Sequence, residues 1–182
     1  MTKNSTNTAE KRILLVEDEG LVAMTLEETL KRIGYSVVGI AMSGEEALSL
    51  TGERHPDVIL MDIHLQGEMD GIEAAQKIKG LYGIPIIFLT AYSDDETIRR
   101  VVLTESSGYL VKPINTRELF AGIESALYKK RKLDTFMEQQ AAANRPICQC
   151  GIPMIRTFSQ ENGEMIPVGW VCPSCHRFVQ GI

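Results

Sequence analysis

Five polar residues in the first two thirds of the chain have the types and positions that phosphoryl chemistry requires. Each ends or closely follows a short apolar run, and the five are Glu17, Asp18, Asp62, Thr90 and Lys112. Carboxylates that meet at one place repel one another unless a cation neutralises them. Mg²⁺ suits this role because it prefers oxygen ligands and accompanies phosphate groups. A lysine adds a fixed positive charge for an incoming phosphoryl group, and a threonine hydroxyl can bond to one of its oxygens.

Four cysteines form a second set of chemically capable residues. Cys148 and Cys150 make one close pair, Cys172 and Cys175 make another, and 21 residues separate the two pairs. Two close pairs of thiolates are the ligand set that tetrahedral Zn²⁺ needs. His176 could replace one sulfur as a ligand. A redox-active thiol pair and a metal-free hairpin are the competing interpretations.

Short apolar runs alternate with amphipathic stretches from Lys11 onward. Five runs have the length and the Ile, Val and Leu content of strands, namely 13–16, 37–40, 58–61, 86–89 and 109–111. Helical patterns begin near Leu21, cover 44–50, 71–81 and 94–104, and begin again at Thr116. The alternation predicts an α/β, flavodoxin-like, doubly wound sheet of five parallel strands. The site of such a sheet lies at the carboxyl ends of its strands, where the five polar residues occur.

The motifs around these residues resemble the receiver domain of two-component response regulators. They are ILLVEDE (13–19), VILMDI (58–63), MDGIEA (69–74), IIFLTA (86–91) and GYLVKP (108–113). They occur in order within residues 11–132, about two thirds of the chain. The loop at 64–68 departs from the pattern, since it has no proline and is one residue longer, but the five polar residues are all present.

The resemblance implies a metal ligand set and a phosphoryl acceptor. Asp62 would accept a phosphoryl group from a sensor histidine kinase. Asp18 would bind Mg²⁺ directly, Glu17 would bind it through water, and the backbone carbonyl of His64 would be a further ligand.

The resemblance also implies a switch. Lys112 and Thr90 would contact the phosphoryl group, and the Lys112–Pro113 peptide bond would be cis. Thr90 would move toward the phosphate and Tyr109 would rotate inward behind it, which would remodel the face formed by the fourth helix, the fifth strand and the fifth helix.

These roles describe a signalling phospho-acceptor rather than an enzyme that acts on other substrates. A phosphatase with an aspartyl nucleophile would normally need a second carboxylate nearby, yet the position two residues after Asp62 is His64. The chain is therefore expected to catalyse only its own phosphorylation and dephosphorylation.

The fifth helical pattern continues past the receiver-like segment. Helix formers fill residues 133–145, with no Gly or Pro before Pro146. An a/d register, broken by Lys130, contains Leu119, Ile123, Ala126, Leu133, Met137 and Gln140. The pattern predicts a helical linker over 133–145 that is either solvated or paired with a second copy. A homodimer could form through this helix or through the helix-four, strand-five and helix-five face.

Residues 146–182 are too few to build a large hydrophobic core. Asn162-Gly163 between two apolar runs predicts a β-hairpin. The segment is therefore expected to be a zinc-ribbon-like β module that is stabilised by bound Zn²⁺ in place of a hydrophobic core. Its charges nearly balance, which favours a downstream protein partner as the output. The alternative is a transcription regulator whose ribbon contacts nucleic acid or the transcription machinery.

Overall composition excludes several classes of protein. The 182 residues carry a net charge of -5, which argues against a general nucleic-acid binder because phosphate backbones attract basic surfaces. No apolar run reaches the roughly 20 residues needed to cross a membrane. Residues 1–10 have no apolar core and are predicted to be a disordered polar tail, so the cytoplasm is the expected location.

Overall fold

The computed structural model describes residues 11–91, 106–143, 145–161 and 164–180. The chain divides into two compact units, Met1–Lys132 and Leu133–Ile182. Three predicted features lie outside the described residues: the tail at 1–10, the helix at 94–104 and the Asn162-Gly163 turn. Among the helices of the described ranges, none combines the length and the apolar character that a membrane crossing requires.

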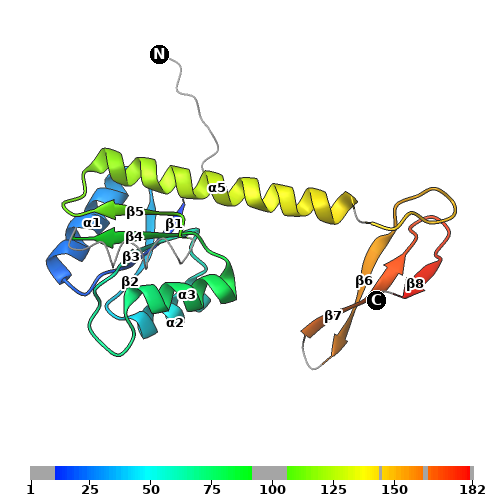
Figure 1. Cartoon of the computed structure of the whole chain (residues 1–182), viewed down its shortest axis with the longest axis horizontal. Helices are drawn as coiled ribbons and strands as arrows, with labels where there is room; N and C mark the ends of the chain where they lie inside the picture. The colour runs from blue at the N-terminus through cyan, green and yellow to red at the C-terminus, as the bar shows by residue number, and fades with distance from the viewer. Residues whose placement is uncertain (1–10, 92–105, 144, 162–163, 181–182) are drawn as a thin grey trace, which may run out of the picture. The chain divides into compact units, whose positions relative to one another are not determined.

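A sheet of five parallel strands forms the centre of the first unit, in the order β2-β1-β3-β4-β5 (Figure 1). The strands are β1 (Arg12–Val16), β2 (Ser36–Ala41), β3 (Val58–Asp62), β4 (Ile86–Thr90) and β5 (Gly108–Val111). All five predicted strands are therefore confirmed, each lengthened by one or two residues. Every residue of β3 and β4 is buried, as expected for central parallel strands that helices cover on both faces.

Four described helices cover the two faces of this sheet. They are α1 (Gly20–Arg32) and α5 (Thr116–Ala143) on one face, and α2 (Gly44–Arg54) and α3 (Gly71–Tyr82) on the other (Figure 1). The starts of α2 and α3 are set by N-caps, because the side chains of Ser43 and Asp70 accept hydrogen bonds from backbone N–H groups three residues later. α5 runs without interruption beyond Lys132, the last residue of the first unit.

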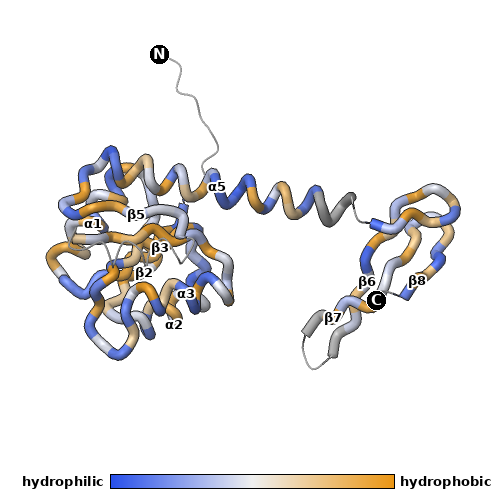
Figure 2. Tube along the Cα trace, viewed as in Figure 1, coloured by the Kyte–Doolittle hydropathy of each residue, from blue (hydrophilic) through white to orange (hydrophobic). Residues whose placement is uncertain are grey.

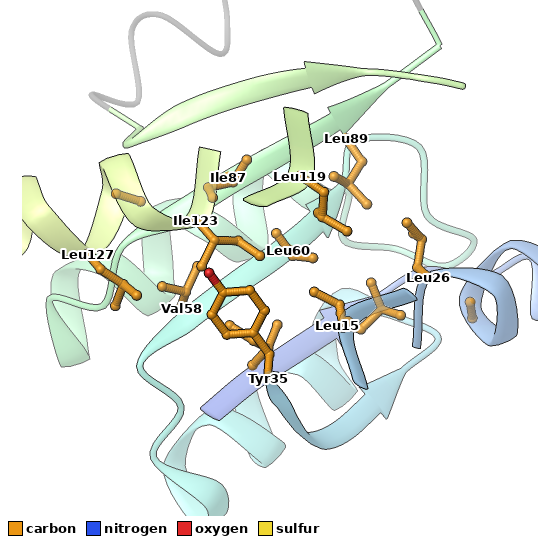
Figure 3. Close-up of a cluster of buried hydrophobic side chains, with 14 residues drawn as sticks. Leu15, Leu26, Tyr35, Val58, Leu60, Ile87, Leu89, Leu119, Ile123 and Leu127 are labelled. Carbon is orange, nitrogen blue, oxygen red and sulfur yellow. The ribbon is translucent and has the colours of Figure 1, made fainter. Parts of the chain in front are cut away.

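Alternate residues of the strands divide the core into two apolar layers. Leu15, Leu60 and Leu89 point toward α1 and α5, where they meet Leu119 and Ile123 (Figure 3). Their neighbours along the strands pack against α2 and α3. Figure 2 shows the result as apolar colour concentrated on the central strands. This packing fixes the positions of the strand ends that carry the polar residues.

A buried tyrosine links the segment before β2 to α5. The Tyr35 side chain is 5% exposed, its hydroxyl donates a hydrogen bond of 2.8 Å to Glu124 Oε1, and its ring lies 6.4 Å from that of Phe120. Burial raises the pKa of Tyr35, and the nearby Glu124 carboxylate raises it further. The hydroxyl therefore remains a donor across the physiological range.

Replacement of Tyr35 by phenylalanine is expected to destabilise the receiver by about 1–2 kcal/mol, because a hydrogen bond to a charged acceptor is lost while the ring still packs. Urea unfolding followed by far-UV circular dichroism would measure the change. Tyr128→Phe is the matched control, since Tyr128 lies on α5, the helix that carries Glu124, and is 55% exposed. This substitution should alter stability by less than about 0.5 kcal/mol. Equal effects of the two substitutions would contradict the role given to the Tyr35 hydroxyl.

The second unit contains a three-stranded antiparallel sheet in the order β6-β7-β8. Its strands are β6 (Ile155–Glu161), β7 (Glu164–Val171) and β8 (Phe178–Gln180). The first two confirm the predicted hairpin. β6 begins at Ile155, after a separate bridge between Ile147 and Pro153 that encloses the first cysteine pair. The apolar pattern does not predict β8, which has three residues and is too short to show a periodicity.

Candidate functional site

The carboxyl ends of the strands bring the predicted polar residues together. Glu17 directly follows β1, Asp62 ends β3, Thr90 ends β4, and Lys112 directly follows β5. Glu17, Asp18 and Asp62 each offer a carboxylate oxygen, and these oxygens lie within 4.8 Å of one another. Parallel pairing of β1 with β3 and of β3 with β4 produces this convergence, since it aligns the strand ends at one edge.

Lys112 bridges two of the carboxylates. Its Nζ donates to Glu17 Oε2 at 2.6 Å and to Asp62 Oδ2 at 2.5 Å. Both acceptors are almost fully buried, with Glu17 1% and Asp62 7% exposed. The remaining oxygen of Asp62, Oδ1, accepts the backbone N–H of His64 at 3.0 Å. The Lys112–Pro113 peptide is cis, as the resemblance implies.

The electrostatics of the cluster reflect an excess of negative charge. The pKa of Glu17 is raised, mainly because the side chain is buried and also because the charge of Asp62 lies nearby. The hydrogen bond from Lys112 lowers this pKa but does not outweigh the other two effects. Burial acts to lower the pKa of Lys112, but hydrogen bonds to Asp62 and Glu17 outweigh it, so that this pKa is raised and the lysine stays cationic. Three carboxylates thus lie together, and the Lys112 ammonium group pairs with two of them. This donor set, rich in oxygen and short of positive charge, fits a hard divalent cation.

The two residues that are predicted to form a switch occupy contrasting environments. Thr90 is buried at the end of β4, where its carbonyl accepts the backbone N–H of Lys112 at 2.7 Å. Tyr109 lies on β5 opposite Phe88 and is 50% exposed. The tyrosine ring therefore has an outward position in this structure.

A glycine next to the site has a role that the sequence interpretation missed. The backbone N–H of Gly71 donates to the carbonyl of Ile63 at 3.1 Å, and a Cβ built on Gly71 would lie 1.8 Å from the carbonyl oxygen of Asp62. Only a residue without a side chain allows α3 to begin this close to the end of β3. The Asp-Gly pair within the MDGIEA motif is the signal that could have indicated it.

The four cysteines form a compact cluster in the second unit. The Sγ atoms of Cys148 and Cys175 are 3.4 Å apart, those of Cys150 and Cys172 are 3.4 Å apart, and those of Cys150 and Cys175 are 3.9 Å apart. A tetrahedral zinc ion with Zn–S bonds of about 2.3 Å has S···S edges of about 3.8 Å. The sulfurs lie close to this arrangement, and the four cysteines are not joined by disulfides.

Backbone groups around the sulfurs form tight turns of the kind that surround the cysteine ligands of structural zinc sites. Gly151 has φ +83° and donates its N–H to the carbonyl of Cys148, which closes a tight turn after the first cysteine pair. The N–H of Cys175 donates to Cys172 Sγ at 3.5 Å and is the main reason that the pKa of Cys172 is lowered to about 6. Within the described residues the cluster consists of the four cysteines, and His176 lies exposed beside it.

Comparison with known proteins places most of the chain in one family. The family model for the response regulator receiver domain matches residues 13–124. The transcriptional regulatory protein PdtaR of Mycobacterium tuberculosis is 37% identical over 132 residues, which are 72% of this chain and 63% of that protein. The chain thus matches somewhat less than two thirds of the length of this curated relative.

Solved structures agree with this assignment. The signal receiver domain of a modulated diguanylate cyclase from Desulfovibrio desulfuricans is 39% identical with a TM-score of 0.64, and the match covers 67% of this chain and 97% of that one. The chemotaxis protein CheY4 of Vibrio cholerae is 28% identical with a TM-score of 0.59, over 65% of this chain and 99% of that one. The chain therefore belongs to the response regulator receiver family, a family of two-component signalling proteins that interact with sensor histidine kinases.

Proposed function

We propose that Asp62 accepts a phosphoryl group from a sensor histidine kinase, with Mg²⁺ bound by Glu17, Asp18, Asp62 and the backbone carbonyl of His64. The observation that carries this proposal is the convergence of three carboxylates and Lys112 at one sheet edge. Mg²⁺ would supply the positive charge that neutralises these carboxylates and the incoming phosphoryl oxygens.

The residues of the chain would perform the transfer mainly by positioning. A carboxylate oxygen of Asp62 attacks phosphorus while the bond from phosphorus to the histidine nitrogen of the kinase breaks, so the phosphoryl group changes carrier without a separate acid catalyst on this chain. The His64 N–H and Lys112 hold the two Asp62 oxygens in place beforehand. After transfer, Lys112 and the hydroxyl of Thr90 contact the phosphoryl oxygens.

The switch follows from the same contacts. Movement of Thr90 toward the phosphoryl group would vacate space behind it, and Tyr109, which is half exposed on the adjacent strand, would rotate into that space. The surface around β5 and α5 would change with it. That surface, or the extension of α5, could then form a homodimer or bind a downstream protein.

Incubation of the full chain with acetyl phosphate and Mg²⁺ tests the acceptor. The intact mass is expected to rise by one phosphoryl group in the parent protein and to stay unchanged in Asp62→Asn. Asp57→Asn is the matched control, because Asp57 lies just before the opposite end of β3, where it accepts the backbone N–H of Arg12, and it should be phosphorylated as the parent is. Equal phosphorylation of Asp62→Asn and the parent would overturn the proposal.

We also propose that Cys148, Cys150, Cys172 and Cys175 bind a structural zinc ion. The sulfur separations of 3.4–3.9 Å support it, as does the N–H donated to Cys172 Sγ, which favours the thiolate that binds the metal. The ribbon would then serve as an output module that contacts a downstream protein, controlled by the state of the receiver.

A second candidate output is control of transcription. It is supported by the similarity to PdtaR, a transcriptional regulatory protein that is 37% identical to this chain over 132 residues. A salt-dependent mobility shift of DNA or RNA by the full, phosphorylated chain would favour this output. Absence of any shift at low salt would favour the protein-binding output.

A further inference from the structure

The four cysteines of the second unit differ in their access to solvent. Cys150 and Cys175 are exposed, whereas Cys148 and Cys172 are buried, so each close pair contributes one exposed and one buried member. The thiolate is both the form of cysteine that binds a metal and the form that reacts with electrophiles, and its reactivity depends on how accessible it is. Two of the four proposed zinc ligands are therefore open to a small oxidant dissolved in water.

Each exposed cysteine has a buried cysteine of the other pair in contact with it. The sulfurs of Cys150 and Cys172 are 3.4 Å apart, and so are those of Cys175 and Cys148. A cysteine that is oxidised to sulfenic acid condenses with a neighbouring thiolate to form a disulfide. An oxidised Cys150 or Cys175 therefore has a thiolate beside it that can complete a disulfide.

The distribution of cysteines confines this chemistry to the second unit. All four lie between residues 148 and 175, and residues 11–132 contain none. The ribbon around them has a small core, formed by Cys148, Met154 and Cys172 with Trp170 packed against it. Bound zinc supplies most of the folding free energy of modules of this kind. A chemical change at the sulfurs therefore becomes a change in the fold of the ribbon.

We infer that Cys150 and Cys175 are sites of oxidation by a hydroperoxide, and that their oxidation releases the zinc ion that we propose for this cluster. In the first step a thiolate attacks one oxygen of hydrogen peroxide, the O–O bond breaks, and a sulfenic acid and hydroxide form. In the second step a neighbouring thiolate attacks the sulfenic sulfur and a second hydroxide leaves. Each disulfide thus consumes one peroxide molecule, which gains two electrons, while two thiolates lose one electron each.

Release of the metal follows because zinc binds thiolates and not the sulfurs of a disulfide. The first disulfide leaves two thiolate ligands, and the second leaves none. Reduction by a thiol regenerates all four thiolates and with them the site. The ribbon in this way responds to an oxidant while the receiver responds to a phosphoryl donor, so that one chain carries two separate inputs.

Titration of the reduced, zinc-loaded full chain with hydrogen peroxide tests the inference. A metallochromic dye measures released zinc, and intact mass counts the disulfides. One zinc ion per chain is expected to leave as two disulfides form, and dithiothreitol with added Zn²⁺ should reverse both changes. Met24, which is 60% exposed, is an internal reference, because zinc should leave at peroxide exposures that do not yet oxidise this thioether. Zinc retained until Met24 is oxidised would overturn the inference.

A histidine variant tests the role of an exposed sulfur. Cys175→His keeps a zinc ligand but forms no disulfide, and it should slow zinc release about twofold or more, since one reactive thiolate is removed. Ser174→Ala alters the same turn, keeps all four sulfurs and should release zinc as the parent does. Brief alkylation of the zinc-loaded parent with iodoacetamide should label Cys150 and Cys175 before Cys148 and Cys172. Equal rates in the three proteins, or labelling of the buried cysteines first, would contradict the assignment.

Failure of this inference can be distinguished from failure of the zinc site. Freshly reduced protein that contains no zinc would refute the site and the inference together. Zinc-loaded protein that keeps its metal in peroxide would refute the inference alone. Phosphorylation of Asp62 by acetyl phosphate should be the same before and after oxidation, because the receiver has no cysteine to oxidise.

Discussion

Removal of zinc, or replacement of Cys172 by serine, is expected to unfold residues 146–182 and to leave the receiver folded. The described part of the second unit has a very small buried core, formed by Cys148, Met154 and Cys172 with Trp170 packed against it. Two of these three residues are proposed zinc ligands. A core of this size cannot offset the loss of chain entropy by burial alone. Structural zinc contributes about 10–16 kcal/mol in isolated zinc-finger peptides, which is enough to decide whether such a module folds.

The fluorescence of Trp170 reports on the second unit separately from the receiver, because Trp170 is the one tryptophan of the chain and lies in β7. Chelation should shift its fluorescence to that of an exposed indole and make the segment after α5 sensitive to protease. Restoring Mg²⁺ after chelation should restore phosphorylation of the receiver without restoring the fluorescence. Restoring Zn²⁺ should reverse both changes in the second unit.

Ser174→Ala serves as the control for Cys172→Ser, because it alters a side chain of the same turn without removing a sulfur ligand. It should bind one zinc ion and keep the fluorescence of the parent. Trp170 fluorescence and protease resistance that survive chelation unchanged would show that the ribbon folds without metal. The proposed phosphorylation of Asp62 would be unaffected by that result.

The elements of the receiver could be predicted because each strand is a separate apolar run. β3 and β4 are buried along their whole length. Val58–Asp62 and Ile86–Thr90 therefore lack the alternation of polar and apolar residues that makes the first and last residues of a strand difficult to predict. β8 could not be predicted in this way. Its three residues, Phe178–Gln180, are all exposed, and their pairing with β7 depends on the turn that follows Cys172 rather than on their own pattern.

The composition of the site was predictable to a similar extent, but its contacts were not. Charged residues at successive strand ends indicate a cluster, because parallel pairing brings those ends together. The sequence contains no signal that Lys112 bridges Glu17 and Asp62, since that depends on side-chain reach across β4.

Gly71→Ala is expected to destabilise the receiver by about 3 kcal/mol or more, at the upper end of the cost of overpacking a core. The added Cβ would lie 1.8 Å from the carbonyl oxygen of Asp62, 2.9 Å from its carbonyl carbon and 3.1 Å from the Cα of Ile63. All three are backbone atoms, so no side chain can rotate away. Either α3 must shift outward or the end of β3 must move, and the second response displaces the proposed phosphoryl acceptor itself.

Gly80→Ala tests whether this effect belongs to the position rather than to the substitution. Gly80 lies in the same helix, and a Cβ there would meet nothing within 4 Å. Alanine at that position should stabilise the receiver by about 0.5–1 kcal/mol, because it reduces the entropy lost on helix formation. Urea unfolding should therefore give changes of opposite sign for the two variants, and phosphorylation by acetyl phosphate should slow in Gly71→Ala alone. Equal stability of both variants would mean that α3 can move away from Asp62 at little cost, and that the close approach of Gly71 does not fix the site.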